Sequence, residues 1–176
     1  YTTAGIDQGT ALASLNSQVC TYTFPSGAID LASNVYFPTG VYPPGVYCIT
    51  GAASIGTGGI TLEGSGTYIF RSTGALNTVA NSIVTLNPLN SPSVCDVWWT
   101  PGGATTLGAN STFIGTVIDP AGITIGSTVT WLGSALAFGG TVSTTGDTIT
   151  VPVCALSRPP TITKVFFPAT IASGGT

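Results

Sequence analysis

The fold is decided by residues 105–140, which read Thr105-Thr-Leu-Gly-Ala-Asn-Ser-Thr-Phe-Ile-Gly-Thr-Val-Ile-Asp-Pro-Ala-Gly122 and then Ile123-Thr-Ile-Gly-Ser-Thr-Val-Thr-Trp-Leu-Gly-Ser-Ala-Leu-Ala-Phe-Gly-Gly140. These two stretches align without a gap, and a partial third copy begins at Thr141. Identical residues stay in phase at Thr106/Thr124, Gly108/Gly126, Thr112/Thr130, Gly115/Gly133 and Gly122/Gly140. A chain that repeats in this way returns to the same place once per copy.

The length of the repeat indicates what each copy forms. About 18 residues of extended chain, at roughly 3.3 Å each, make a closed loop of about 60 Å, enough for three short strands and three corners. An antiparallel sandwich would also have short Thr/Val/Ile strands between Gly-rich turns, but it has no reason to keep these residues in phase. The repeat therefore favours a mainly β protein, a parallel β-solenoid of triangular section.

The composition excludes several classes of partner. The chain has 176 residues, enough for one domain with a core, and only 5% of them are charged. Its three Lys and Arg residues are too few to neutralise a nucleic-acid backbone or to bind an anionic membrane surface. No long apolar run spans a bilayer. The surface is expected to be rich in hydroxyl groups rather than ionic.

The cysteines indicate disulfide bonds. They follow no Cys-x-x-Cys pattern, and the chain has no histidine to complete a zinc site, so we expect neither metal nor cofactor. Four cysteines allow three pairings, of which we favour Cys20 with Cys48 and Cys95 with Cys154. Two disulfides predict an extracellular location, secreted or on the cell surface, with any signal peptide already removed.

The rest of the chain divides into segments. Residues 3–20 are the one candidate helix, with Ile6, Leu12, Leu15 and Val19 on one face, although a loop remains the alternative. Short strands are expected at 60–63, 68–71, 75–79 and 83–86. Residues 94–99, which contain two adjacent Trp residues, are expected to form a strand that covers the core. We assign residues 1–155 to the solenoid domain and 156–176 to a Pro-rich linker and a strand-prone tail.

Several blocks resemble a known family. Residues 66–78, Cys95-Asp-Val-Trp-Trp99, residues 107–116, Ser134-Ala-Leu-Ala137 and, ahead of them, Pro44-Gly-Val-Tyr47 are similar to successive blocks of the microbial ice-binding proteins. The resemblance implies a right-handed, three-faced β-solenoid flanked by one α-helix, which adsorbs to ice through a flat face. Family members usually carry coils before the helix, whereas this sequence opens at the helix. The tail from Pro159 resembles the first strand of Ig-like repeats.

The expected binding residues form one repeating row. In this family the ice-binding face often has Thr, then Ala or Gly, any residue, then Thr or Asn, and Thr145-Gly-Asp-Thr148 keeps that pattern. We therefore predict contact with ice or another ordered surface through the in-phase positions of the three copies. These positions are Thr112, Thr130, Thr148, Ala109, Ser127 and Thr145.

No catalytic constellation is recognisable, so we expect a protein that is not an enzyme. Histidine, the usual general base, is absent, and the carboxylates are not paired in the phase of the repeat; Asp119 and Asp147 are better interpreted as turn residues. One alternative function is a self-assembling subunit of a filament or surface layer, a homo-oligomer formed when residues 159–176 donate a strand to a neighbour. Another is a carbohydrate-binding adhesin.

Overall fold

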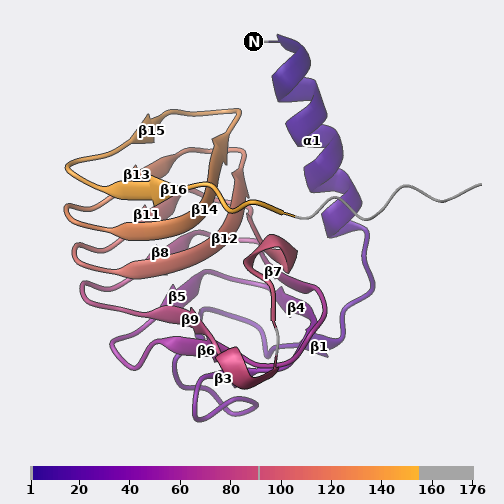
Figure 1. Ribbon diagram of the computed structural model, residues 1–176. Helices are drawn as coiled ribbons and strands as arrows, with labels where there is room; N and C mark the ends of the chain where they lie inside the picture. The colour runs from indigo at the N-terminus through magenta and orange to yellow at the C-terminus, as the bar shows by residue number, and fades with distance from the viewer. Residues whose placement is uncertain (1, 91, 155–176) are drawn as a thin grey trace, which may run out of the picture.

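The computed structural model describes residues 2–90 and 92–154, which form a stack of β-coils with one helix alongside (Figure 1). Helix α1 spans Thr2–Asn16. The strands are β1 Tyr22–Thr23, β2 Ile29–Asp30, β3 Val41–Tyr42, β4 Gly45–Ile49, β5 Ala53–Ile55, β6 Ile60–Leu62, β7 Tyr68–Ser72, β8 Leu76–Thr78, β9 Val84–Leu86, β10 Val97–Pro101, β11 Thr105–Leu107, β12 Thr112–Asp119, β13 Ile123–Ile125, β14 Thr130–Ala137, β15 Val142–Ser143 and β16 Thr148–Thr150. Two 3-10 helices, η1 Pro88–Asn90 and η2 Val94–Asp96, lie between β9 and β10.

The strands form three parallel sheets, one for each side of the solenoid. The seven-stranded sheet has the order β1-β4-β7-β10-β12-β14-β16, the six-stranded sheet β15-β13-β11-β8-β5-β2, and the three-stranded sheet β3-β6-β9. Each strand pairs with the strand one coil away, as the repeat predicts: Thr106 pairs with Thr124, and Thr112 with Thr130. The predicted β-solenoid with one helix is confirmed.

The third side continues from β9 into the first halves of β12 and β14, because Ile83 forms a bridge with Thr112. β12 then turns a corner into the seven-stranded sheet at Gly115, whose φ is +97°. A Cβ atom there would lie 2.7 Å from a methyl carbon of Val97. Both the backbone angle and the close approach therefore require glycine.

Aromatic rings form the central column of the core. Tyr22, Tyr47, Phe70 and Trp99 stack one above the next, with ring centroids 5.0, 4.7 and 4.3 Å apart. They are brought together because in-register parallel strands repeat the inward position in every coil. The indole N–H of Trp99 donates to the carbonyl of Ile114 at 2.9 Å, which satisfies its one polar atom.

The helix differs from its prediction in extent and in the face it presents. It ends at Asn16 rather than Cys20. Ile6 is 68% and Val19 87% exposed, so neither packs on the solenoid. The half-buried helical positions are Gly5, Gln8, Gly9, Leu12 and Leu15.

The segment around the paired Trp residues also differs. Residues 94–96 form η2, and only from Val97 onward does the chain become a strand, β10, inside the seven-stranded sheet. Trp99 points into the core while Trp98 points outward and is half-buried. The segment therefore supplies a coil of the solenoid rather than a cover for it, because its backbone pairs with β7 and β12.

Both favoured disulfides are present. Cys20 bonds Cys48 and Cys95 bonds Cys154. The first ties the segment after α1 to β4, and the second ties the end of the last coil to η2. The predicted linker and tail, 156–176, lie outside the described residues.

We expect Trp99→Ala to lower the free energy of unfolding by about 3–5 kcal/mol, because it opens a cavity in the middle of the aromatic column. Urea unfolding followed by far-UV circular dichroism measures this. Trp98→Ala, on the same strand but pointing outward, is the matched control and should cost clearly less. Equal losses in both variants would contradict the central role of the column.

Buried tyrosines should make the protein sensitive to alkali. Burial raises the pKa of Tyr42 and Tyr47 well above the usual range and raises the pKa of Tyr68 to about 12. In the unfolded chain tyrosine has its ordinary pKa of about 10. The contribution of these neutral tyrosines to the free energy of unfolding is therefore fully present below about pH 10, and it is lost as the pH rises through their raised pKa values in the folded protein. Urea midpoints measured against pH, with tyrosinate absorbance, should fall only on that alkaline side; ionisation in the folded protein at the ordinary pKa would contradict this.

Candidate functional site

The seven-stranded side of the solenoid is covered. Ile69, Thr100 and Ile118 alternate with core residues and so point outward, yet they are only 4%, 1% and 1% exposed. Helix α1 packs over β10, and the segment after the helix is held against this sheet by the Cys20–Cys48 disulfide. This side is therefore unsuited to contact with a large surface.

The third side is covered in part. Ile114 points outward from β12 but is only 6% exposed, because η2 packs on β12 and β14. The disulfide from Cys95 to Cys154 holds the last described residues over the same region. What stays accessible is the edge nearest the six-stranded sheet.

The six-stranded sheet has an open outer face. Its middle strands alternate between buried and accessible residues, so one side chain per strand points outward. These side chains pair in register across all six strands, and among the described residues no helix or loop buries them. In order along the stack, the outward row consists of Asp30, Ser54, Asn77, Thr106, Thr124 and Ser143.

A second row of small residues lies beside the first. Each of these residues immediately precedes a strand, and its carbonyl accepts a hydrogen bond from the first strand residue of the preceding coil. For example, the Leu76 N–H donates to the Ala104 carbonyl at 3.3 Å, and the Ile123 N–H donates to the Thr141 carbonyl at 2.9 Å. All of them are half-exposed or exposed. This small-residue row consists of Ala52, Ala75, Ala104, Gly122 and Thr141. The face thus alternates hydroxyl or amide groups with methyl groups.

A buried carboxylate fixes the corner next to the small-residue row. Asp119 is completely buried; its Oδ2 accepts from the Thr105 hydroxyl at 2.6 Å, and its Oδ1 accepts from the backbone N–H groups of Ala121 and Gly122 at 2.6 and 2.9 Å. These bonds compensate for removing the carboxylate from water. They also hold Gly122 in its row, consistent with the prediction that Asp119 is a turn residue.

The residues predicted from sequence to bind lie at another corner. Thr112, Thr130 and Thr148 are exposed and paired in register at the start of the third side. Ala109, Ser127 and Thr145 precede them, in the turns between the six-stranded sheet and that side. The structure brings all six together as one narrow strip, bordered by the covered part of the third side.

The last of these turns is organised by a carboxylate. Oδ2 of Asp147 accepts from the Thr144 hydroxyl at 2.6 Å and from the Thr145 N–H at 2.9 Å, and Oδ1 accepts from the Val129 N–H at 3.0 Å. Burial tends to raise the pKa of Asp147, but these hydrogen bonds outweigh it and hold the pKa below the usual value. The prediction of a turn residue agrees with this geometry.

Sequence reasoning missed the open face of the six-stranded sheet as a candidate site. A signal for it was present, because Thr106 and Thr124 are identical in successive copies. The earlier coils obscured it: there the outward row carries Asp30, Ser54 and Asn77 instead of Thr.

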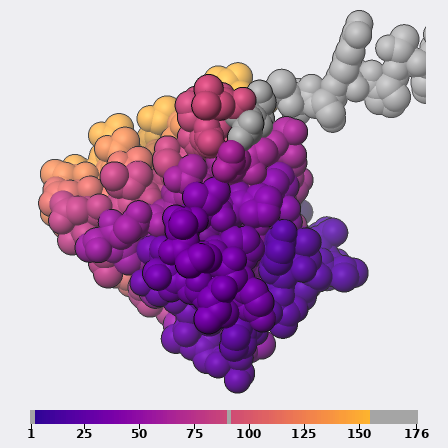
Figure 2. Space-filling model, turned by 90° about the horizontal axis from the view of Figure 1, so that it is seen from below, coloured from indigo at the N-terminus to yellow at the C-terminus, as the bar shows by residue number. Residues whose placement is uncertain are grey.

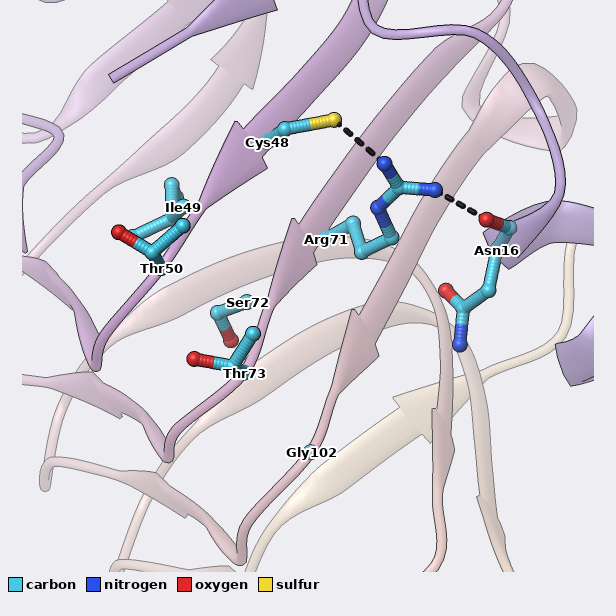
Figure 3. A pocket seen from close by; sticks show the side chains of 8 residues that line it. All are labelled: Asn16, Cys48, Ile49, Thr50, Arg71, Ser72, Thr73 and Gly102. Carbon is cyan, nitrogen blue, oxygen red and sulfur yellow. Dashed lines mark hydrogen bonds between the residues drawn. The ribbon is translucent and has the colours of Figure 1, made fainter. Parts of the chain in front are cut away.

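A cavity of about 430 Å³ lies beside the end of α1, lined by Asn16, Cys48, Ile49, Thr50, Arg71, Ser72, Thr73 and Gly102 (Figure 3). Arg71 crosses it from β7 and donates to the carbonyls of Asn16 and Gln18. Its other terminal nitrogen lies 2.9 and 2.8 Å from the sulfurs of Cys20 and Cys48. Cations bind well at the carbonyl end of a helix, so Arg71 anchors α1 to the sheet.

The N-terminal coils close the lower end of the solenoid, as the purple atoms of Figure 2 show. With that end closed, the seven-stranded side covered and the third side covered in part, the described residues leave the face of the six-stranded sheet as the broad regular surface. The architecture defines a three-sided parallel β-solenoid with one open face. The family model described as ice-binding-like matches residues 1–150, and the chain belongs to this family.

Solved structures agree with this assignment. An ice-binding protein from an Antarctic bacterium of the Flavobacteriaceae is 30% identical, with a TM-score of 0.75 over 88% of this chain. The ice-binding protein of the Antarctic ascomycete Antarctomyces psychrotrophicus is 26% identical, with a TM-score of 0.73 over 87%. One from an Antarctic biological consortium is 25% identical, with a TM-score of 0.70 over 85%.

The chain spans 35%, 72% and 65% of the length of these three proteins, respectively. No curated protein sequence matches it. Among the described residues, no helix is long and apolar enough to cross a membrane.

Replacing Arg71 with Met should loosen the helix, because Met keeps an apolar stem but donates no hydrogen bond. We expect a loss of about 1–3 kcal/mol in the free energy of unfolding, with faster proteolysis between α1 and β1. Urea unfolding and limited proteolysis measure the two effects. Asn16→Ala is the matched control, since only its backbone carbonyl binds Arg71; if both variants behaved like the parent, the anchor would be refuted.

Proposed function

We propose that the protein adsorbs to ice through the open outer face of its six-stranded sheet. The observation that carries this proposal is the pair of adjacent rows, one of hydroxyl and amide side chains and one of methyl-bearing or hydrogen-only residues. Membership of the ice-binding-like family and the ice-binding proteins among the solved structures support it.

Adsorption to a crystal plane depends on many simultaneous weak contacts rather than on a few strong ones. Parallel strands about 4.8 Å apart repeat the same side chain at a fixed interval. Their hydrogen-bonded backbones hold the array rigid, so little conformational entropy remains to be lost on contact. Of the outward row, only Asp30 carries a charge, and it lies in the first coil, away from Thr106 and Thr124.

The strip of Thr112, Thr130 and Thr148, with Ala109, Ser127 and Thr145, is the competing binding surface. Its exposure and in-register pairing favour it. Its width argues against it, because the next outward residue on β12, Ile114, is buried beneath η2. We therefore rank it second to the six-stranded face.

We further propose that the protein works outside the cytoplasm and without catalysis. The two disulfides support an oxidising compartment. Adsorption to a surface requires no nucleophile, acid or base.

Assembly into a filament or layer is a second candidate function. Within residues 2–90 and 92–154, β15 and β16 each pair with one neighbour only, and a strand with an open edge can accept a further strand, which favours this candidate. Donation by residues 159–176 involves residues outside the described part of the chain. For a carbohydrate-binding adhesin we find no specific supporting observation.

The ice-binding proposal is tested by replacing Thr106 and Thr124 with Tyr. The bulky rings should hold the six-stranded face away from the crystal, so thermal hysteresis and the faceting of ice crystals should both fall at least several-fold. Nanolitre osmometry with crystal imaging measures these properties on the purified protein.

The matched control replaces Thr112, Thr130 and Thr148 with Tyr, which alters the competing strip. Circular dichroism must first establish that both variants fold. Loss of hysteresis in this control alone would move the site to the strip, and a parent protein without hysteresis would refute ice binding.

A further inference from the structure

The corner between the six-stranded sheet and the third side repeats one backbone conformation. The turns that join β11 to β12, β13 to β14 and β15 to β16 lie one above the next at this corner (Figure 1, left). Four successive coils each have one residue of positive φ here, in equivalent positions because Thr112, Thr130 and Thr148 pair two residues further on. This corner row consists of Asn81, Asn110, Thr128 and Gly146, with φ of 61°, 58°, 59° and 66°.

Thr128 is the member of the corner row that fits its conformation badly. Glycine has no Cβ atom to clash at positive φ, and asparagine adopts this region more readily than most residues. A β-branched residue there is a true outlier, because its branched Cβ atom crowds the backbone. The other three coils use asparagine or glycine, so this coil gives up stability by carrying threonine. Strain of this kind is found where a side chain serves function.

The hydroxyl group of Thr128 is turned toward the chain. Its Oγ1 donates to Oδ1 of Asn110 in the preceding coil, and it also lies 2.6 Å from the carbonyl oxygen of Ser127. The side chain as a whole is nevertheless exposed. With the hydroxyl held by the corner itself, the methyl group is the part of Thr128 left to contact a surface, and the bond to Asn110 fixes its direction.

Thr128 borders both candidate binding surfaces. It follows Thr124 of the outward row by four residues and precedes Thr130 of the competing strip by two. Between Thr124 and Thr128 the chain passes through Gly126, where a Cβ atom would lie 2.7 Å from the backbone nitrogen of Ala109. No side chain fits at that glycine without a shift of the neighbouring coil. The array on the six-stranded face therefore stops at Thr124 and continues only at the corner.

We propose that Thr128 is a further contact residue of the adsorbing surface, with its methyl group against the ice, and that Asn110 is its positioning residue. The inference rests on the proposed function. A methyl group fixed by a closed turn and by a hydrogen bond has little conformational entropy to lose on contact. Because the corner is shared, Thr128 contributes whether the six-stranded face or the strip meets the crystal.

The test exchanges the corner residues of two coils in the full chain. Thr128→Asn gives this coil the residue that two earlier coils carry, and Asn81→Thr, the matched control, places the strained residue beside the exposed Ile83. The urea midpoint should rise in the first variant and fall in the second, because strain is removed from one and added to the other. Thermal hysteresis should fall about two-fold or more in Thr128→Asn, which loses one of many simultaneous contacts, and should not change in Asn81→Thr.

Two more variants separate the groups involved. Thr128→Ser keeps the hydroxyl that reaches Asn110 but lacks the methyl group, so its hysteresis should fall as far as that of Thr128→Asn. Asn110→Gly tolerates the positive φ but removes the acceptor, so hysteresis should fall although Thr128 is intact. Circular dichroism establishes beforehand that each variant folds.

The possible failures can be told apart. Full hysteresis in Thr128→Asn or Thr128→Ser, with hysteresis lost in the variant that carries Thr106→Tyr and Thr124→Tyr, would refute the contact and leave the proposed function standing. A lower urea midpoint in Thr128→Asn would mean that threonine stabilises the turn, and the argument from strain would be wrong. A parent protein without hysteresis would refute ice binding and this inference together.

Discussion

In-register stacking of parallel coils is the constraint on which the rest of this structure depends. Each coil hydrogen-bonds to the coils above and below, so an inward residue in one copy is followed by an inward residue in the next. The ring column from Tyr22 to Trp99 results directly from this. Closure at the corners places Gly115, Asn110 and Thr128 at positive φ. Glycine and asparagine adopt this conformation readily, whereas β-branched threonine does so only under the constraint of the surrounding coils.

The order of the surface is inherited from the same stacking. Inward and outward residues lie on the same strands, so the outward side chains repeat at the same strand separation as the inward ones, whatever their type. What distinguishes the three sides is their cover: α1 lies over one and η2 over another, and the six-stranded sheet is left open. A regular surface of short side chains on a rigid backbone is therefore a direct consequence of the stacked coils.

The two ends of the stack solve the problem of free strand edges differently. At the first coil, aromatic side chains and proline-containing loops close the core. At the last coil, no other described strand pairs with the outer edges of β15 and β16, and Val142 and Ile149 are 40% and 39% exposed among the described residues.

By itself, the sequence determined the solenoid and the pairing of Thr112 with Thr130, because an in-phase repeat forces the register. It favoured the two disulfides that the structure shows but left three pairings open. It also indicated a helix at the N-terminus, but not which face packs: Ile6 is exposed, whereas Gly5 and Gln8 are half-buried. Only the tertiary structure decided which outward row lies on a broad open surface. Thr112 recurs as Thr in three copies and Thr106 in two, and both rows are exposed. The surface beside Thr112 is narrow because η2, from outside the repeat, packs on β12 and β14.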